Sequence, residues 1–574
     1  MKSFKIISLF LVVLTAVSCS DFLIKEPLSL TTETYFTNET QLRSFLTGVY
    51  SPLMQESFYG AAYLIDISGG DDLSFYQRSG ATGFQCATAN SSNAAITNYW
   101  KILYVGIMRA NVLLENADKS TEIAEKVRTE VKAQALFLRS FYYYNLVQGW
   151  GDVPFRLTSA QSVDGLSMVR TNKDTIYDHI IADIISTLPN LPRFGPTGKV
   201  TDPGYVTQSA AKGILARIYL FRAGEHYRDD LTGNPVKIAS YYANAKRWAV
   251  EVKDSAVNIG IHSLVSPYSR IFTDLSEDKY NSTGKVESIW EAEEAGNRTT
   301  PESSAGRIGS SIGFGCTFDY STNAKFQNSL GMANPGYSYR FIYASLKLYE
   351  MYDSEGDTTR GNWNIANYDY VVGTDVDKTI SGRLYFKGKA PKGMTLPAVV
   401  GGFNYAEATS DGAKTRCSAK YRREYEKLAP KNKNFTPINV PILRYSDILL
   451  MIAEAENELN GPTGLAYECI NDVRTRANLS LLSGLNKDTF RDAIKKERAM
   501  EFCFEAIRRW DLIRWGDYLT AMQGMQGYVD SPDWASGFKY AAAYYKVSKA
   551  YNYLPIPVAE MTSNKAISQN NPGW

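Results

Sequence analysis

Helical periodicity in two long blocks constrains the fold more than any other feature of this chain. Apolar residues recur at steps of three and four through residues 99–255 and 441–516, and residues so spaced share one face of an α-helix. Examples are Trp100, Leu103, Ile107, Ala110 and Leu114 in the first block, and Ile448, Ile452, Ala455 and Leu459 in the second. Short turns separate the stripes, so consecutive helices should pair as antiparallel hairpins. We therefore predict a mostly α fold, an irregular tetratricopeptide-like scaffold of helical hairpins with long irregular loops and short strands.

The last stripe of the second block predicts the longest helix and a row of acidic residues on it. Ala499, Phe502, Cys503, Ala506, Trp510 and Ile513 share one face, and Gly516 is the expected end. Glu497, Glu501 and Glu505 then form a row spaced by four residues. Paired acids that hydrolyse sugars face each other across a cleft about 5–10 Å wide, whereas a row on one helix faces one way. We therefore interpret these carboxylates as members of structural ion pairs; Arg498, Arg508 and Arg509 can pair with them or with neighbouring helices.

The segments outside the helical blocks have a different composition. Residues 60–98, 263–440 and 517–553 are rich in Gly, Ser, Asn and Asp and also in aromatic residues, of which the chain has many, with 39 Tyr. Long irregular segments in a compact domain are usually functional surfaces, and dense aromatics argue against disorder. We expect loops and short strands that face a ligand, on a single domain spanning residues 19–574.

The amino terminus has the pattern of an export signal with a lipid-attachment site. Lys2 and Lys5 precede an apolar run over residues 6–17, and Cys19 follows small residues. The run is shorter than the roughly 20 residues that span a bilayer as a helix. We predict that residues 1–18 are a lipoprotein signal peptide and that acylated Cys19 anchors the mature protein to membrane lipid.

Charge and cysteine usage exclude several classes of function. The formal charge of +2 falls to zero when Lys2 and Lys5 leave with the signal, so there is no electrostatic case for nucleic acid. Five cysteines remain besides Cys19, an odd number, and no CxxC motif occurs. The three histidines are scattered. We predict no cofactor and no metal, although Asp71 and Asp72 form an acidic pair that could touch calcium.

Several segments, read in order, resemble the SusD/RagB family of outer-membrane nutrient-binding lipoproteins. The resemblance rests on Ser20-Asp21-Phe22-Leu23, Phe137-Leu138-Arg139-Ser140 running into Gly149-Trp150-Gly151-Asp152-Val153-Pro154, Pro441 to Ile448, Glu497-Arg498 through Gly516, Leu554-Pro555-Ile556-Pro557, and the closing Gln569-Asn570-Asn571-Pro572-Gly573-Trp574. The match spans the whole mature chain. It departs at the end, where Asn571 is extra and Trp574 stands in place of a tyrosine.

The resemblance implies a non-catalytic lipoprotein that is anchored in the outer membrane and faces the cell exterior. It implies capture of an oligosaccharide or polysaccharide and delivery to a SusC-like TonB-dependent transporter as partner. The alternatives are a peptide ligand on the same fold, a lipid-anchored glycosidase, and a periplasmic adaptor that binds only protein. The sequence has no HExxH or phosphate-loop motif, which disfavours the enzyme.

Sugar binding needs aromatic faces and polar partners together. Apolar C–H faces of sugar rings pack on aromatic rings, and the hydroxyls pair with amide, carboxylate and guanidinium groups. Both kinds of residue are concentrated in the irregular segments. The candidate ligand platform consists of Phe75, Tyr76, Arg78, Phe84, Phe318, Tyr320, Asn323, Tyr337, Trp363 and Tyr368.

The lipid anchor can be tested by one substitution. Cys19→Ser removes the thiol that would be acylated, so we expect the protein to leave the membrane fraction in a fractionation experiment. Ser20→Ala, beside it, should leave the protein in that fraction. Retention of the Cys19→Ser protein on the membrane would contradict the prediction.

Overall fold

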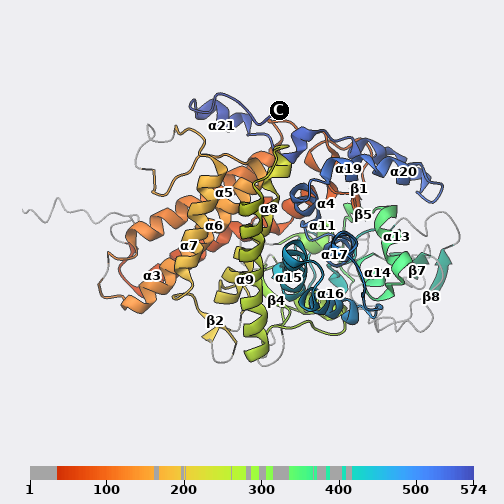
Figure 1. The fold of residues 1–574 in the computed structure, drawn as a ribbon, viewed down its shortest axis with the longest axis horizontal. Helices are drawn as coiled ribbons and strands as arrows, with labels where there is room; N and C mark the ends of the chain where they lie inside the picture. Colours follow the sequence, from red (N-terminus) through yellow and green to blue (C-terminus); the bar gives the residue numbers. More distant parts are fainter. Residues whose placement is uncertain are drawn as a thin grey trace, which may run out of the picture.

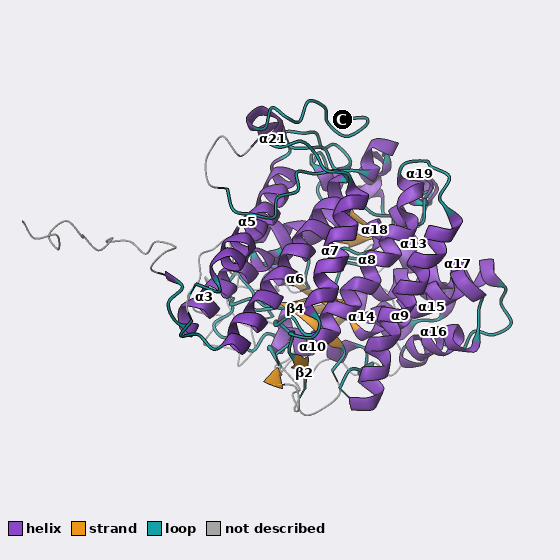
Figure 2. Cartoon of the chain, turned by 60° about the vertical axis from the view of Figure 1, so that its left-hand side comes forward, coloured by secondary structure: helices purple, strands orange, loops and turns teal. Residues whose placement is uncertain are grey.

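The structure is a computed structural model, and it is mostly helical, as predicted (Figure 2). It describes residues 35–119, 121–160, 167–195, 199–200, 202–259, 261–279, 286–296, 306–314, 335–365, 368–371, 383–387, 404–408 and 416–574. The signal peptide and Cys19 therefore lie outside the described residues. Among the helices of the described part, none combines the length and apolar character needed to cross a bilayer.

The first helical block contains long helices that pack in chain order. They are α3 (Glu39–Tyr50), α5 (Ala94–Asn116), α6 (Glu125–Trp150), α7 (Lys173–Thr187), α8 (Gln208–Arg228) and α9 (Pro235–Ile259). Helix α5 packs on α6, α6 on α7, and α8 on α9. Figure 1 shows these helices side by side in one half of the molecule. The expected hairpins are thus present, while the tetratricopeptide-like character of their stacking stays a prediction.

The second block packs on the first through two of its helices. It comprises α15 (Tyr445–Asn460), α16 (Gly464–Arg476), α17 (Lys487–Phe502) and α18 (Arg508–Arg514). Helix α15 packs on α9, and α18 packs on α8, so the two blocks share one apolar core. The predicted stripe residues Trp100, Leu103 and Ile448 are buried in it.

The segments expected to be loops and strands also contain short helices. These are η2 (Ser51–Met54), η3 (Glu56–Gly60), α4 (Ala62–Gly69), η4 (Phe84–Cys86), α10 (Ser269–Glu277), α11 (Ile308–Ser311), α13 (Leu346–Glu355), α14 (Thr358–Asn364), η8 (Arg423–Tyr425), α19 (Tyr518–Gln523), α20 (Met525–Asp530), η9 (Ser536–Tyr545), η10 (Lys549–Asn552) and α21 (Val558–Ser563). In Figure 1, α13, α14, α19, α20 and α21 lie toward the outside of the ribbon.

The strands are short and form small separate sheets. β1 (Ser74–Tyr76) pairs antiparallel with β5 (Ile342–Ala344), with Phe75 opposite Tyr343. β4 (Ser288–Ala292) pairs antiparallel with β9 (Val440–Arg444), β2 (Arg193–Phe194) pairs parallel with β3 (Lys199–Val200), and β6 (Tyr368–Val371), β7 (Arg383–Lys387) and β8 (Asn404–Ala408) form one sheet in that order.

Local sequence explains where several helices begin and how closely they pack. The Asn93 side chain accepts a hydrogen bond from the backbone N–H of Ile96 at the start of α5, and Asn486 and Thr489 form a capping box on α17. A Cβ atom at Gly106 would lie 2.3 Å from the ring of Tyr142. Glycine at this position therefore lets α5 and α6 approach each other.

The predicted continuous helix from Ala499 to Ile513 is wrong. Helix α17 ends at Phe502, and α18 starts at Arg508, because Phe504 and Ala506 adopt left-handed backbone conformations with φ of 63° and 57°. The ammonium group of Lys420 donates hydrogen bonds of 2.8 Å to the carbonyl oxygens of Glu501 and Cys503, which the end of the helix leaves free. Glu505 consequently lies in the turn and not on the helix.

The three glutamates are structural, as predicted, and form a buried ion-pair network. The Glu501 carboxylate accepts hydrogen bonds from Arg444 at 3.0 Å, Arg476 at 2.5 Å and Arg360 at 3.2 Å. Glu497 pairs with Arg360 and Arg474, and Glu505 pairs with Lys420 and Arg444. The network joins α17 to α14, α16, β9 and the segment around residue 420.

Of the two alternatives for the arginines near this row, the structure shows pairing with neighbouring elements. Arg498 binds Asp447 at 2.7 Å and Asp511 at 2.8 Å. Arg508 binds Asp72 at 2.8 Å. Arg509 donates to the hydroxyl of Tyr518 and to the backbone oxygens of Gly70 and Tyr551.

Electrostatics keeps Glu501 ionised in the interior. Burial alone would raise the pKa of its carboxyl, but the guanidinium groups of Arg476, Arg444 and Arg360 lower this pKa well below its usual range. Each of the four side chains is at most 3% exposed. The charges therefore depend on one another for their solvation.

Breaking this network should destabilise the fold strongly. Glu501→Gln keeps the shape of the side chain but leaves three buried guanidinium groups without their shared counter-charge, so we expect a loss of about 3–5 kcal/mol in the free energy of unfolding. Urea unfolding followed by circular dichroism measures it. The control is Glu39→Gln, which removes a solvent-exposed pair with Arg43 and should cost at most about 1 kcal/mol. Equal losses in the two variants would contradict the structural role of the network.

Candidate functional site

A run of alternating aromatic residues leads into β5. In the stretch from Tyr337 to Tyr343 every second residue is aromatic, and these rings are half-buried, whereas Ser338, Arg340 and Ile342 between them are buried. The run is not a continuous strand, because Arg340 adopts a left-handed conformation with φ of 53°. Burial nevertheless alternates along it, so the rings share the solvent side.

Neighbouring backbone holds this run in place. The N–H groups of Tyr339 and Phe341 donate to the carbonyl oxygens of Ser310 and Ser311 at 2.6 Å and 2.9 Å. On the other side, the N–H of Gln77 donates to the carbonyl of Phe341 at 2.9 Å, which extends the β1–β5 pairing. The run is therefore fixed between α11 and the segment that follows β1.

Four of the half-buried rings form a continuous row, which we call the aromatic ladder: Tyr337, Tyr339, Phe341 and Tyr76. The Tyr337 ring meets the Tyr339 ring edge to face, with centroids 4.8 Å apart. Tyr339 and Phe341 are stacked at 5.2 Å with an interplanar angle of 5°, and Phe341 and Tyr76 are stacked at 5.6 Å. Such a row offers a partly exposed aromatic surface several rings long.

Polar and charged groups border the ladder. The guanidinium of Arg78, an exposed residue, lies 4.7 Å from the Phe341 ring centroid, and the ammonium of Lys433 lies 4.9 Å from that of Tyr337. The Tyr339 hydroxyl donates to the amide oxygen of Asn434 at 3.1 Å. Aromatic surface with cations and amides at its edge is the combination that sugar rings need.

A buried carboxylate anchors the ladder to the helical scaffold. Asp72, just before β1, accepts hydrogen bonds from Arg508 of α18 at 2.8 and 2.9 Å and from Lys347 of α13 at 2.6 Å. Burial would raise the pKa of Asp72, but these two cations lower it far below its usual range. The carboxylate is thus the shared ion-pair partner of Arg508 and Lys347.

Asp71 differs from its neighbour, because among the described residues no salt bridge to its carboxyl is formed. Its Oδ1 accepts hydrogen bonds from the N–H of Leu73 at 2.8 Å and from the hydroxyl of Ser74 at 3.3 Å. Burial, and then the adjacent Asp72 carboxylate, raise the pKa of Asp71 to about 8. Asp71 is consequently protonated at neutral pH, directly below β1.

The structure brings only part of the predicted platform to one surface. Tyr76, Arg78 and Tyr337 meet at the ladder. Phe75 and Phe84 are instead buried in the core, with 1% and 2% exposed, and Trp363 packs in a separate cluster with Phe272. Their rings fill the interior, so they offer no face to a ligand. Phe318, Tyr320 and Asn323 lie outside the described residues, and Tyr368 starts β6.

Tyr339, Phe341 and Asn434 were not among the predicted site residues. A signal for two of them is present, since the sequence Tyr337-Ser338-Tyr339-Arg340-Phe341-Ile342-Tyr343 alternates with a period of two, which is typical of an extended segment with one aromatic face. Asn434 has no such signal, because it reaches Tyr339 only through the tertiary fold.

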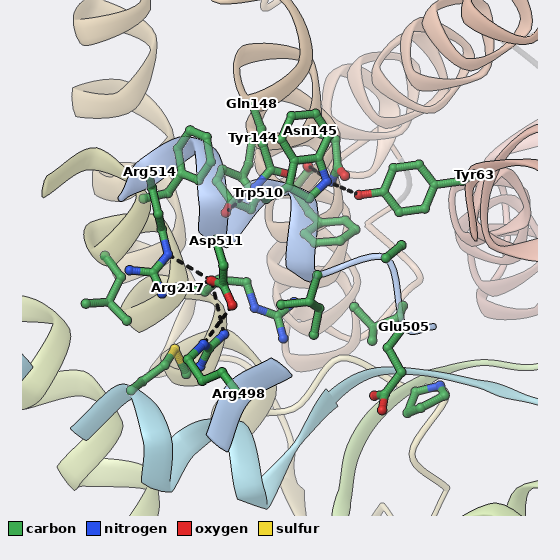
Figure 3. Close-up of a pocket in the computed structure, with 18 of the residues that line it drawn as sticks. Tyr63, Tyr144, Asn145, Gln148, Arg217, Arg498, Glu505, Trp510, Asp511 and Arg514 are labelled. Carbon is green, nitrogen blue, oxygen red and sulfur yellow. Dashed lines mark hydrogen bonds and ion pairs between the residues drawn. The ribbon is translucent and has the colours of Figure 1, made fainter. Parts of the chain in front are cut away.

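A cavity lies inside the molecule, where α6, α8, α15 and α18 meet (Figure 3). Its volume is about 50 Å³, and its wall includes Arg217, Arg498, Asp511 and Arg514. Asp511 accepts hydrogen bonds from Arg498 at 2.8 Å and from Arg514 at 2.9 Å, and Trp510 donates to the Tyr63 hydroxyl at 2.9 Å.

This interior cavity is too small to be the ligand site, and the charged side chains that line it are already paired with one another. At roughly 10–15 Å³ for each buried water, it has room for a few water molecules. Its arginines are engaged in ion pairs within the fold, including Arg217 with Asp447 at 2.7 Å. Across the described ranges, no three or more His, Cys, Asp or Glu residues gather in an arrangement that could hold a metal ion.

Comparison with known families identifies the class of protein. Residues 287–574 match the model described as "SusD family", and residues 21–220 match the model described as "Starch-binding associating with outer membrane". The first match covers half of the chain. The protein therefore belongs to the SusD family, as the resemblance of its motifs indicated.

Individual relatives agree with this assignment over the full length. SusD-like protein P25 of Formosa agariphila is 25% identical over 603 residues, with 100% of this chain and 99% of the relative covered. The starch-binding protein SusD of Bacteroides thetaiotaomicron is 24% identical, with 82% and 78% covered. The crystal structure of a SusD homologue from Bacteroides thetaiotaomicron superposes with a TM-score of 0.77 at 24% identity, covering 95% of this chain and 98% of that one.

The protonated carboxyl below β1 should make stability depend on pH. The folded state holds the Asp71 proton up to about pH 8, whereas the unfolded chain releases it near pH 4. Between these values the folded state binds more protons, so the free energy of unfolding should fall as pH rises. Asp71→Asn should remove part of this decline when urea unfolding is measured at pH 5 and pH 8.

Two comparisons sharpen this measurement. A remainder of the decline is expected in Asp71→Asn, because burial also raises the pKa of Glu291 to about 7. Asp118→Asn changes a carboxylate that is 60% exposed and should leave the decline as it is in the parent. If Asp71→Asn also kept the full decline, the assignment of the proton to Asp71 would be wrong.

Proposed function

We propose that this protein is a non-catalytic surface lipoprotein that captures an oligosaccharide or polysaccharide on the aromatic ladder. The observation that carries the proposal is a row of four half-buried rings, bordered by Arg78 and Asn434, on a chain of the SusD family. A related fold supports it: surface glycan-binding protein A from Bacteroides thetaiotaomicron, with a TM-score of 0.64 at 20% identity and covering 93% of this chain, was solved in complex with laminarihexaose.

The carboxylates most suggestive of an enzyme are engaged elsewhere. Glu497, Glu501 and Glu505 are buried and paired with arginines and a lysine. A glycosidase needs two carboxyl groups that face a sugar across a cleft. The arrangement of these three residues thus favours a binding protein over a glycosidase.

Anchoring and delivery complete the proposal. Acylated Cys19 would hold the protein on the outer membrane, facing the cell exterior, and a SusC-like TonB-dependent transporter would receive the glycan. The description of the matched family model, which mentions the outer membrane, supports the location. The transporter follows from the family resemblance.

Removing one ring of the ladder should weaken glycan binding. For Tyr337→Ala we expect a loss of about 1–3 kcal/mol in binding free energy, or roughly 5- to 150-fold in Kd, because a tyrosine ring that contacts the ligand on such a surface acts as a hot spot. Calorimetric titration with laminarihexaose, a panel of polysaccharides and a panel of peptides measures it.

The matched control changes a tyrosine remote from the ladder. Tyr205 is 49% exposed on the loop before α8, so Tyr205→Ala should bind like the parent protein. Heat from peptides and none from glycans would favour the peptide-binding alternative. Turnover of a polysaccharide by the purified protein would contradict the non-catalytic assignment.

A further inference from the structure

A surface groove lies beside η9, whose tyrosines donate hydrogen bonds to the segment next to the aromatic ladder. It runs between α19, α20, η9 and η10 and has a volume of about 400 Å³. Small-ligand sites in proteins measure about 300–1,000 Å³. The groove is therefore large enough for one or two sugar rings, unlike the interior cavity.

The floor of this groove is aromatic and rigid. It is formed by the buried side chains of Met522, Tyr545, Val547 and Tyr551. The Tyr545 hydroxyl donates to the carbonyl of Ser74 at 3.0 Å, and the Tyr551 ring packs on Trp574 with centroids 4.9 Å apart. With 2% and 7% of their surface exposed, Tyr545 and Tyr551 give the groove an ordered base, and a ligand would bind mainly through the exposed rim.

The rim is polar and carries one positive charge. Gln523, Gln526, Lys546 and Ser548 are exposed there. The Gln526 amide N–H donates to Asp530 at 2.9 Å, so its carbonyl oxygen can accept from a ligand hydroxyl. The residues that line the groove include a lysine and no carboxylate.

The groove and the ladder share a wall. The hydroxyls of Tyr540 and Tyr544 in η9 donate to the backbone oxygens of Gln77 and Arg78, beside the ladder, and the next residue, Tyr545, lines the groove. Consecutive Cα atoms are about 3.8 Å apart. The groove is therefore adjacent to the segment that carries Arg78.

Charge points to the kind of sugar. Arg78 at the ladder and Lys546 at the groove are both exposed, and within the described part of the chain neither forms an ion pair. Two cations along one path complement a polymer with carboxylate or sulfate groups. Helical segments frame the groove, so an extended peptide would find no sheet edge to join there.

We infer that this groove is a second subsite for the same glycan and that it takes an acidic sugar unit opposite Lys546. The inference rests on the proposed function, since the ladder must hold the rest of the chain. It names the substrate class as a carboxylated or sulfated polysaccharide.

Affinity electrophoresis of the full chain in detergent tests this inference. Native gels would contain polygalacturonate, alginate, chondroitin sulfate, laminarin, starch or xylan, and the polysaccharide that retards the protein most would then be used with variants. Lys546→Ala should weaken the apparent affinity about fivefold, the effect expected of one exposed charge. Raising the salt concentration should weaken the parent in the same way.

A double variant and two controls separate the subsite from the ladder. Gln523→Ala/Gln526→Ala changes only exposed rim residues and should weaken binding to long oligosaccharides from the same polysaccharide while leaving short ones unaffected. Lys237→Ala changes an exposed lysine on α9 and should have no effect. Tyr337→Ala reports on the ladder alone.

Each result decides between the claims. If Tyr337→Ala abolishes the retardation and the groove variants leave it unchanged, the second subsite is wrong. The proposed function is then kept. A neutral polysaccharide as the best ligand overturns the charge assignment. No retardation by any of the six polysaccharides overturns both the proposed function and this inference.

Discussion

The ion-pair network around Glu501 is the interaction on which the rest of the structure depends. Through it α17 binds Arg360, Arg444 and Arg476, three arginines from α14, β9 and α16. Because these charges are buried, each is stable only in the presence of the others. The network also holds Lys420, whose ammonium occupies the break between α17 and α18. It thereby fixes a segment that is not part of any long helix.

That segment connects the network to the aromatic ladder. The N–H of Ser418 donates to the carbonyl of Ile342 at 3.0 Å, and the N–H of Ala344 donates to that of Arg416 at 2.9 Å, so β5 lies between β1 and residues 416–418. On its other side, β1 is tied to α18 through Asp72 and Arg508. Buried ion pairs therefore fix the strands that carry the aromatic ladder. A ligand would meet a surface that is ordered before binding.

The sequence predicted the parts of the fold that repeat locally. The stripes through Trp100 and Ile448 correctly indicated α5 and α15, and the motif order correctly indicated the family. The helix through Ala506 could not be predicted to break, because the group that satisfies the freed carbonyls, Lys420, is about eighty residues away in the chain. Composition also could not separate Tyr76, which is half-buried, from its neighbour Phe75, which is in the core.

By itself the sequence determined the helical blocks, the alternation of rings before β5 and membership of the SusD family, and it is the sole basis for the predicted lipid anchor at Cys19. The tertiary structure decided which rings reach the surface, which carboxylates are paired, and that a groove with Lys546 at its rim lies beside the ladder. The physical reason is the separation along the sequence of the residues that are in contact. Periodicity records contacts between residues a few positions apart, whereas exposure and charge pairing are set by contacts such as that between Asp72 and Arg508, over four hundred residues apart.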